Sequence, residues 1–175
     1  MIANIARTLA AFLPLALAPG QGTSTEVHMG NGIKIGDARA DRCAVWIRLT
    51  AVAQANQGGI PFPARKAHTA QLPPATTLSQ MAGAIPGASG DVRVRYWPAN
   101  DRSAARSTSW ANVAASTNYA HTFTLTGLNA GARYIIIAEG KRPGADRSSC
   151  TVEGQIQLPY RPNDPAAVSF CVVCG

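Results

Sequence analysis

The C-terminal cysteines have the most familiar chemical spacing in this chain. Cys171 and Cys174 form a C-x-x-C pair, which in other proteins serves as a redox couple or as half of a zinc site. The redox form lies at the start of a helix that follows a strand. Here the pair ends an apolar segment, and the sequence has no second C-x-x-C. We therefore predict that the spacing is coincidental and that neither cysteine is catalytic.

The remaining reactive residue types form no recognisable site either. His28, His68 and His121 lie far apart, and no two of them have the spacing of a metal site. The sequence has no G-x-S-x-G nucleophile motif. The stretch GNGIKIG opens an expected strand, whereas a phosphate-binding loop opens a helix. We predict no catalytic, cofactor-binding or metal-ligating residue in this chain.

The charge distribution argues against nucleic-acid binding. Sixteen Lys and Arg residues against nine Asp and Glu residues give a formal net charge of +7, and such a balance can indicate an anionic partner. The basic residues are scattered, however, and no Lys/Arg run with interleaved aromatic residues occurs. We expect most of them to lie on solvated strand faces, including Arg39, Arg42, Arg48, Arg93, Arg95, Arg133 and Arg147.

Short segments that alternate apolar and polar residues must form the scaffold of the chain. In RCAVWIRLT, DVRVRYWP and HTFTLTGL the apolar residues recur at every second position, which is typical of half-buried antiparallel strands. TVEGQIQLP fits a last strand at or near a sheet edge. Together with 16 glycines and 12 prolines, the pattern predicts an all-β, immunoglobulin-like or fibronectin type III-like antiparallel sandwich.

The segment GLNAGARYIIIAEG is the strongest local motif. Its leucine, glycine-containing turn and Tyr134 predict a tyrosine corner, in which the phenol hydroxyl bonds backbone a few residues upstream. Tyr134 and Ile136 share one face of the following strand, but Ile135 and Ile137 make the other face apolar too. With Trp97, we expect them to form an apolar patch that packs against a following domain. The alternative is that the insertion described next covers them.

Residues 52–89 interrupt the strand pattern with a long insertion rich in proline, alanine and glycine. Within it, TTLSQMAGAIPG predicts a short helix that Thr76 or Thr77 caps and Pro86 terminates. Its apolar stripe would consist of Leu78, Met81 and Ile85.

The two ends of the chain suggest export and a second domain. Residues 1–25 resemble a leader, since Arg7 precedes a short apolar run and Ala16-Leu17-Ala18 fits a cleavage pattern. The run is too short for a stable membrane span. Four cysteines permit disulfides in an exported protein, although free buried cysteines are an equally good interpretation. We divide the rest into a sandwich over 26–160 with its insertion at 50–90, a proline-stiffened linker over 161–167, and an orphan strand over 168–175.

Five segments in this order and spacing resemble the N-terminal part of PhoD-like alkaline phosphatases over residues 32–175: GIKIGDARADRCAVWIRLT, GDVRVRYWP, HTFTLTGLNAGARYIIIAEG, TVEGQIQLP and VSFCVVCG. That resemblance implies a secreted protein in which a sandwich precedes a metallophosphoesterase domain that hydrolyses phosphate mono- and diesters with iron and calcium. VSFCVVCG looks like the first strand of that second domain. Only Cys174 could match an iron-ligating cysteine of the family. Val173 and Gly175 depart from the family's serine and glutamine at the flanking positions, and another alignment leaves Cys174 unliganded.

The resemblance implies a noncatalytic domain truncated before the active site of its parent enzyme. Two-metal phosphoryl chemistry needs several hard ligands, and the family's other ligands would all lie after Gly175. We therefore expect this chain alone to be inactive and to hold no cofactor. Its expected partner is the missing metallophosphoesterase domain within the same polypeptide, and its expected location is the cell envelope, the periplasm or the exterior. The alternative is a free-standing secreted binding module of the same fold.

Overall fold

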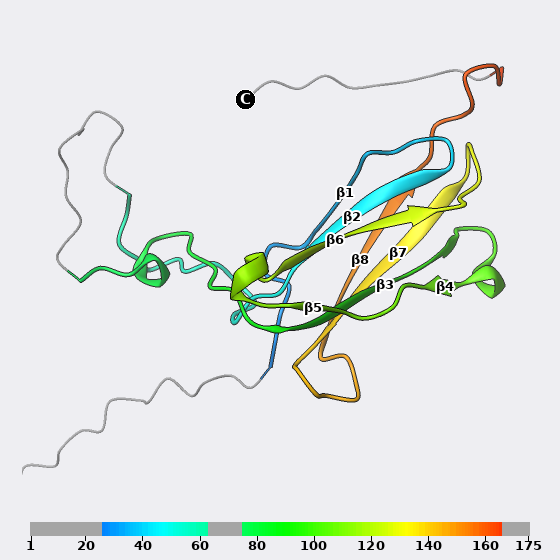
Figure 1. Cartoon of the computed structure of the whole chain (residues 1–175). Helices are drawn as coiled ribbons and strands as arrows, with labels where there is room; N and C mark the ends of the chain where they lie inside the picture. Colours follow the sequence, from blue (N-terminus) through cyan, green and yellow to red (C-terminus); the bar gives the residue numbers. More distant parts are fainter. Residues whose placement is uncertain (1–25, 63–74, 166–175) are drawn as a thin grey trace, which may run out of the picture.

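The computed structural model describes residues 26–62 and 75–165, which form two antiparallel sheets packed face to face (Figure 1). The smaller sheet has the order β1-β2-β6, and it consists of β1 (Ile33–Gly36), β2 (Arg42–Arg48) and β6 (Ala120–Thr126). The larger sheet has the order β4-β3-β7-β8, with β5 also paired to β3. Its strands are β3 (Gly90–Pro98), β4 (Arg106–Ser107), β5 (Ala111–Val113), β7 (Arg133–Lys141) and β8 (Cys150–Gln157).

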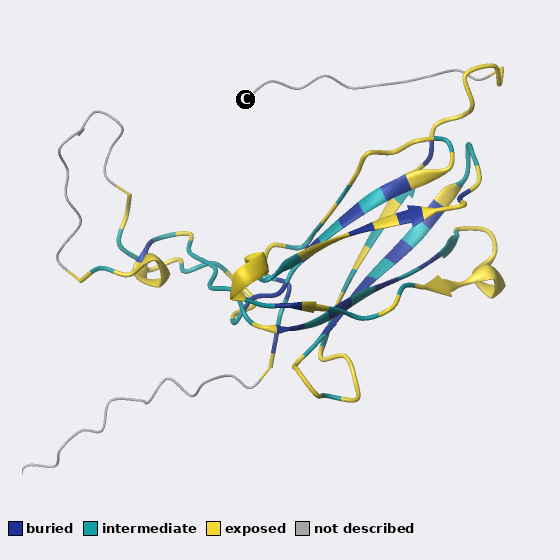
Figure 2. Ribbon diagram, viewed as in Figure 1, coloured by how far each residue is buried: buried dark blue, intermediate teal, exposed yellow. Residues whose placement is uncertain are grey.

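The core lies between the two sheets and follows the alternation of the sequence. Buried residues alternate with more exposed ones along β2 and along the first part of β7 (Figure 2). On β2, Cys43, Val45 and Ile47 are buried, and on β3 Val92 and Val94 are buried. When two sheets pack through their apolar faces, each strand has one side that faces the core and one side that faces solvent. The expected all-β, fibronectin type III-like sandwich is therefore confirmed.

A tyrosine corner fixes the entry into β7. The backbone N–H of Asn129 donates a hydrogen bond to the Tyr134 hydroxyl oxygen at 3.1 Å. The Tyr134 ring is 1% exposed, and Leu128 beside the turn is buried as well. The bond joins the crossing between the sheets to the start of β7, as the sequence predicts.

Gly154 brings the edges of the two sheets together at β1 and β8. A Cβ atom at this position would lie 2.8 Å from Cδ1 of Ile35 and 3.0 Å from Cδ1 of Ile33. Both isoleucines therefore pack directly over the backbone of the edge strand β8, and only glycine leaves the room for them.

The insertion between β2 and β3 leaves and re-enters the sandwich at one place. Thr50 forms an isolated antiparallel bridge with Gly87. Beside it, the N–H of Ala51 donates to Pro86 O at 2.9 Å, and the N–H of Ala88 donates to Leu49 O at 3.2 Å. These contacts close the long loop at its base.

The predicted helix in the insertion is wrong in extent. Only a single 3₁₀ turn forms, η1 (Leu78–Gln80). Met81 then becomes extended and forms a parallel bridge with Ile60, which takes its backbone away from helical geometry. Thr77 does act as the N-cap, and its backbone N–H donates a hydrogen bond to Oε1 of Gln80 at 2.7 Å. Two further 3₁₀ turns occur at η2 (Arg102–Ala104) and η3 (Ala115–Thr117).

Several predictions concern segments outside the described residues. These are the leader at 1–25, the end of the linker, and the orphan strand at 168–175 with Cys171, Cys174 and their C-x-x-C spacing. Cys43 and Cys150 are free thiols. Among the described residues, no helix is long and apolar enough to span a membrane.

Candidate interaction surfaces

The described part of the chain holds no cluster of three or more His, Cys, Asp or Glu residues that could bind a metal ion. His28 lies in a backbone bridge with Thr50. His121 packs edge-on against Phe123, with ring centroids 4.5 Å apart. His68 lies outside the described residues. The structure thus brings the two described histidines to separate places, and the surfaces of the sandwich become the candidates for function.

The outward face of β3, β7 and β8, called the outer face below, contains the predicted apolar residues. Trp97 lies directly across from Ile135, and Arg95 lies across from Ile137. All of them are partly exposed. The Arg102 guanidinium lies 5.5 Å from the centroid of the Trp97 ring.

A charged cluster continues this face toward the other end of β7. The Glu139 carboxylate is buried, with 8% of its side chain exposed, and accepts a short hydrogen bond from Arg93. Nη1 of Arg95 lies 3.5 Å from its second oxygen. Because both guanidinium groups are themselves partly exposed, the cluster sits at the boundary between the sheet and solvent.

Trp110 completes the cluster from the segment before β5. The Arg93 guanidinium lies 4.5 Å from its ring centroid, and the Lys141 ammonium lies 4.8 Å from it. Two cations on one indole give favourable cation–π contacts. Sequence reasoning missed Trp110 and Glu139; the signal for Glu139 is a lone carboxylate on the outward side of an apolar strand.

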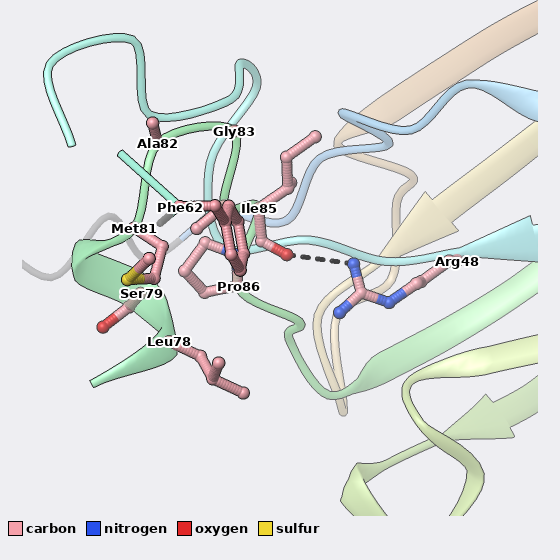
Figure 3. A pocket seen from close by; sticks show the side chains of 10 residues that line it. Arg48, Phe62, Leu78, Ser79, Met81, Ala82, Gly83, Ile85 and Pro86 are labelled. Atoms are coloured by element: carbon pink, nitrogen blue, oxygen red, sulfur yellow. Dashed lines mark hydrogen bonds between the residues drawn. The ribbon is translucent and has the colours of Figure 1, made fainter. Parts of the chain in front are cut away.

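A cavity of about 440 Å³ lies in the insertion, away from the outer face. Its walls come from the two legs of the insertion and from the end of β2 (Figure 3). The lining is apolar apart from Ser79 and one arginine, and consists of Arg48, Phe62, Leu78, Ser79, Met81, Ala82, Gly83, Ala84, Ile85 and Pro86. Sequence reasoning identified Leu78, Met81 and Ile85 as an apolar stripe but assigned them to a helix, and it missed Phe62.

Arg48 approaches this cavity from the sandwich (Figure 3). Its Nη1 donates to Asn31 Oδ1 at 2.9 Å and to Ile85 O at 3.0 Å. Its Nε donates to Asn118 O at 3.3 Å. Arg48 therefore holds the insertion against the sandwich through neutral oxygens alone.

The two described cysteines are protected thiols. Burial raises the pKa of the Cys43 thiol. Burial also raises the pKa of Cys150 to about 11, opposed in part by a hydrogen bond with the backbone of Gly140. Since the thiolate is the reactive form, neither residue has the character of a nucleophile at neutral pH.

Comparisons with known proteins give no family assignment. No family model matches the chain, and no curated protein matches it. Among solved structures, a PhoD structure covers 85% of this chain at 14% identity with a TM-score of 0.48, and this chain covers only 22% of that one. The fn3 domain of human collagen alpha-1(XX) covers 81% at 16% identity with a TM-score of 0.41, and 89% of that domain is matched. A redesigned β-sandwich protein covers 73% at 15% identity with the same score, over 90% of its length.

Proposed function

We propose that this chain is the noncatalytic N-terminal sandwich of a secreted or envelope PhoD-like phosphatase. In this proposal a metallophosphoesterase domain follows it in the parent protein and carries the iron, the calcium and the reactive groups. The ordered set of five sequence segments supports the family, and the outer face supports the role. The sandwich would act as a wall against which the catalytic domain is held.

The observation that carries the proposal is the outward side of β7. A sheet that has one face in water normally shows polar residues on that face. Here Ile135 and Ile137 point outward beside Trp97, on the second strand from the sheet edge. Tryptophan and arginine are also the residue types most enriched where proteins contact each other. This face is therefore suited to pack against a neighbouring domain.

The gene provides the most direct test. We expect the reading frame beyond the codon for Gly175, in this frame or a shifted one, to encode motifs rich in aspartate and histidine that resemble metallophosphoesterase ligands. A coding sequence with nothing phosphatase-like in any frame would contradict the proposal and favour a free-standing module.

A binding experiment tests the docking role. The full chain is titrated with a separately produced metallophosphoesterase domain of a PhoD-like phosphatase, and the affinity is measured by calorimetry. We expect Trp97→Ser to weaken binding about thirtyfold, because a central tryptophan commonly contributes about 2 kcal/mol. Trp46→Ser is the matched control, since Trp46 faces outward from β2 in the other sheet. Equal losses for the two variants, or no binding at all, would refute docking through the outer face.

An activity assay tests the division of labour. The purified chain with added iron and calcium should hydrolyse p-nitrophenyl phosphate no faster than buffer containing the same metals. Hydrolysis that elutes with the folded chain in gel filtration and is lost on heat denaturation would show that the chain has a reactive centre of its own.

A further inference from the structure

Exposed apolar side chains gather at the cavity in the insertion. Four large hydrophobic residues are exposed among the described ones, and two of them, Leu78 at 80% and Phe62 at 68%, line this cavity. Met81, also in the lining, is 1% exposed and gives the cavity a firm floor. Exposed apolar side chains around a concave site are typical of ligand pockets.

Arg48, the single charged residue in the cavity lining, has no carboxylate partner among the described residues. Arg48 makes its three hydrogen bonds to amide and carbonyl oxygens, and none of the salt bridges among the described residues includes it. Its Nη2 has no hydrogen bond to any described residue. By contrast, Arg93 and Arg95 on the outer face both reach a carboxylate. The fixed guanidinium therefore offers unused donors and a full positive charge at an apolar wall.

We propose that this cavity binds a small amphiphile with one carboxylate on an apolar chain. The carboxylate would pair with the Arg48 guanidinium, because such pairs combine charge with matched donor geometry. The chain would lie against Phe62, Leu78 and Pro86 and remove their apolar surface from water. A volume of about 440 Å³ is within the range of small-molecule sites.

The positions of the donors favour a ligand over an entirely internal role for Arg48. Three bonds to neutral oxygens use Nε and Nη1 and fix the plane of the guanidinium. A ligand carboxylate would thus meet a side chain whose rotational freedom is already lost, so little further ordering is needed on binding.

A series of three probes with the same chain and different head groups tests the charge requirement. The full chain is titrated with octanoate, octanol and octyltrimethylammonium, and binding is followed by calorimetry and by NMR shifts of the Leu78 and Met81 methyl groups. We expect octanol to bind about tenfold more weakly than octanoate, because it lacks the charge-assisted hydrogen bonds. The cationic probe should bind more weakly still. Equal affinities for the three probes, or shifts confined to other methyl groups, would overturn the proposal.

Two variants locate the site. Leu78→Ser should weaken octanoate binding about tenfold, because it removes most of one apolar side chain from the contact, and its exposure makes the change harmless to folding. Tyr160→Ser is the control, since Tyr160 is also an exposed hydrophobic residue but lies outside the cavity lining. Arg48→Lys keeps the positive charge but loses the paired N–H donors of the guanidinium, so it should weaken the binding of octanoate more than the binding of octanol. If Leu78→Ser and Tyr160→Ser bind octanoate equally, the cavity is not the site.

This inference is independent of the phosphatase proposal. Octanoate binding uses the insertion and is read at Leu78, whereas domain docking uses the outer face and is read through Trp97. Saturation with octanoate should leave docking unchanged, and a failure of either measurement leaves the other interpretable. Competition between octanoate and the phosphatase domain would instead identify the cavity as a protein-docking groove and contradict the small-ligand assignment.

Discussion

Replacing Tyr134 by phenylalanine removes one oxygen atom from the tyrosine corner and keeps the ring that fills the core. The lost oxygen accepts the Asn129 N–H at 3.1 Å. A typical hydrogen bond contributes about 0.5–1.5 kcal/mol net, and leaving a buried donor unpaired costs about 1–3 kcal/mol. Asn129 itself is exposed, so water can reach its N–H after the substitution. We therefore expect Tyr134→Phe to lower the free energy of unfolding by about 1 kcal/mol.

Urea denaturation followed by tryptophan fluorescence measures this loss. The midpoint should fall while the m-value stays constant, because the corner does not change the surface exposed on unfolding. The melting temperature should drop by roughly 4 °C for a domain of this size. Hydrogen exchange should be faster at Asn129 and at the start of β7 than elsewhere.

Tyr96→Phe is the matched control for this prediction. Tyr96 also lies in the core, at 8% exposure, and the Arg106 guanidinium lies 5.0 Å from its ring centroid. Its hydroxyl makes no hydrogen bond to any described residue, so its removal should change stability by less than about 0.5 kcal/mol. If Tyr134→Phe costs no more than Tyr96→Phe, the hydroxyl does not hold the corner, and the buried ring alone must do so.

Three further substitutions test other parts of the sandwich. Burial raises the pKa of Cys150 from 9.0 to about 11. The contribution of the Cys150 thiol to stability is therefore fully present below pH 9 and is lost as the pH rises through 11. The difference in unfolding free energy between wild type and Cys150→Ala should shrink over that range, and a constant difference would contradict this. Glu139→Gln should cost about 1 kcal/mol, since its partner Arg93 is partly exposed, and much less when Arg93→Gln is already present; fully additive losses in the double-mutant cycle would show that the pair is not coupled. Gly154→Val should cost about 1–3 kcal/mol by overpacking against Ile35, and an unchanged midpoint in urea would mean that the two sheet edges are not in tight contact.

The sandwich was predictable from the sequence because its information is local. A period of two decides which side chains of a strand face inward, and this was correct for Val45, Val94 and Leu125. The tyrosine corner was predictable for the same reason, because donor and acceptor are only five residues apart.

The insertion was not predictable, because its structure depends on distant partners. Leu78 and Met81 have helical spacing, yet Met81 instead pairs with Ile60 in an extended bridge. The charged cluster escaped prediction for a similar reason. Arg93 and Glu139 become neighbours only through the register of β3 and β7, which the individual strands do not reveal.

The closure of the insertion at a single base has a consequence for protein engineering. Hydrogen bonds at Leu49, Ala51 and Ala88 join the two legs of the insertion at its base, so the positions of β2 and β3 in their two sheets do not depend on the length of what lies between. Foreign peptides or a small reporter domain could be grafted there at a modest entropic penalty. Gly87 would have to be retained in any such chimera, since the Tyr119 ring occupies the space of its missing side chain.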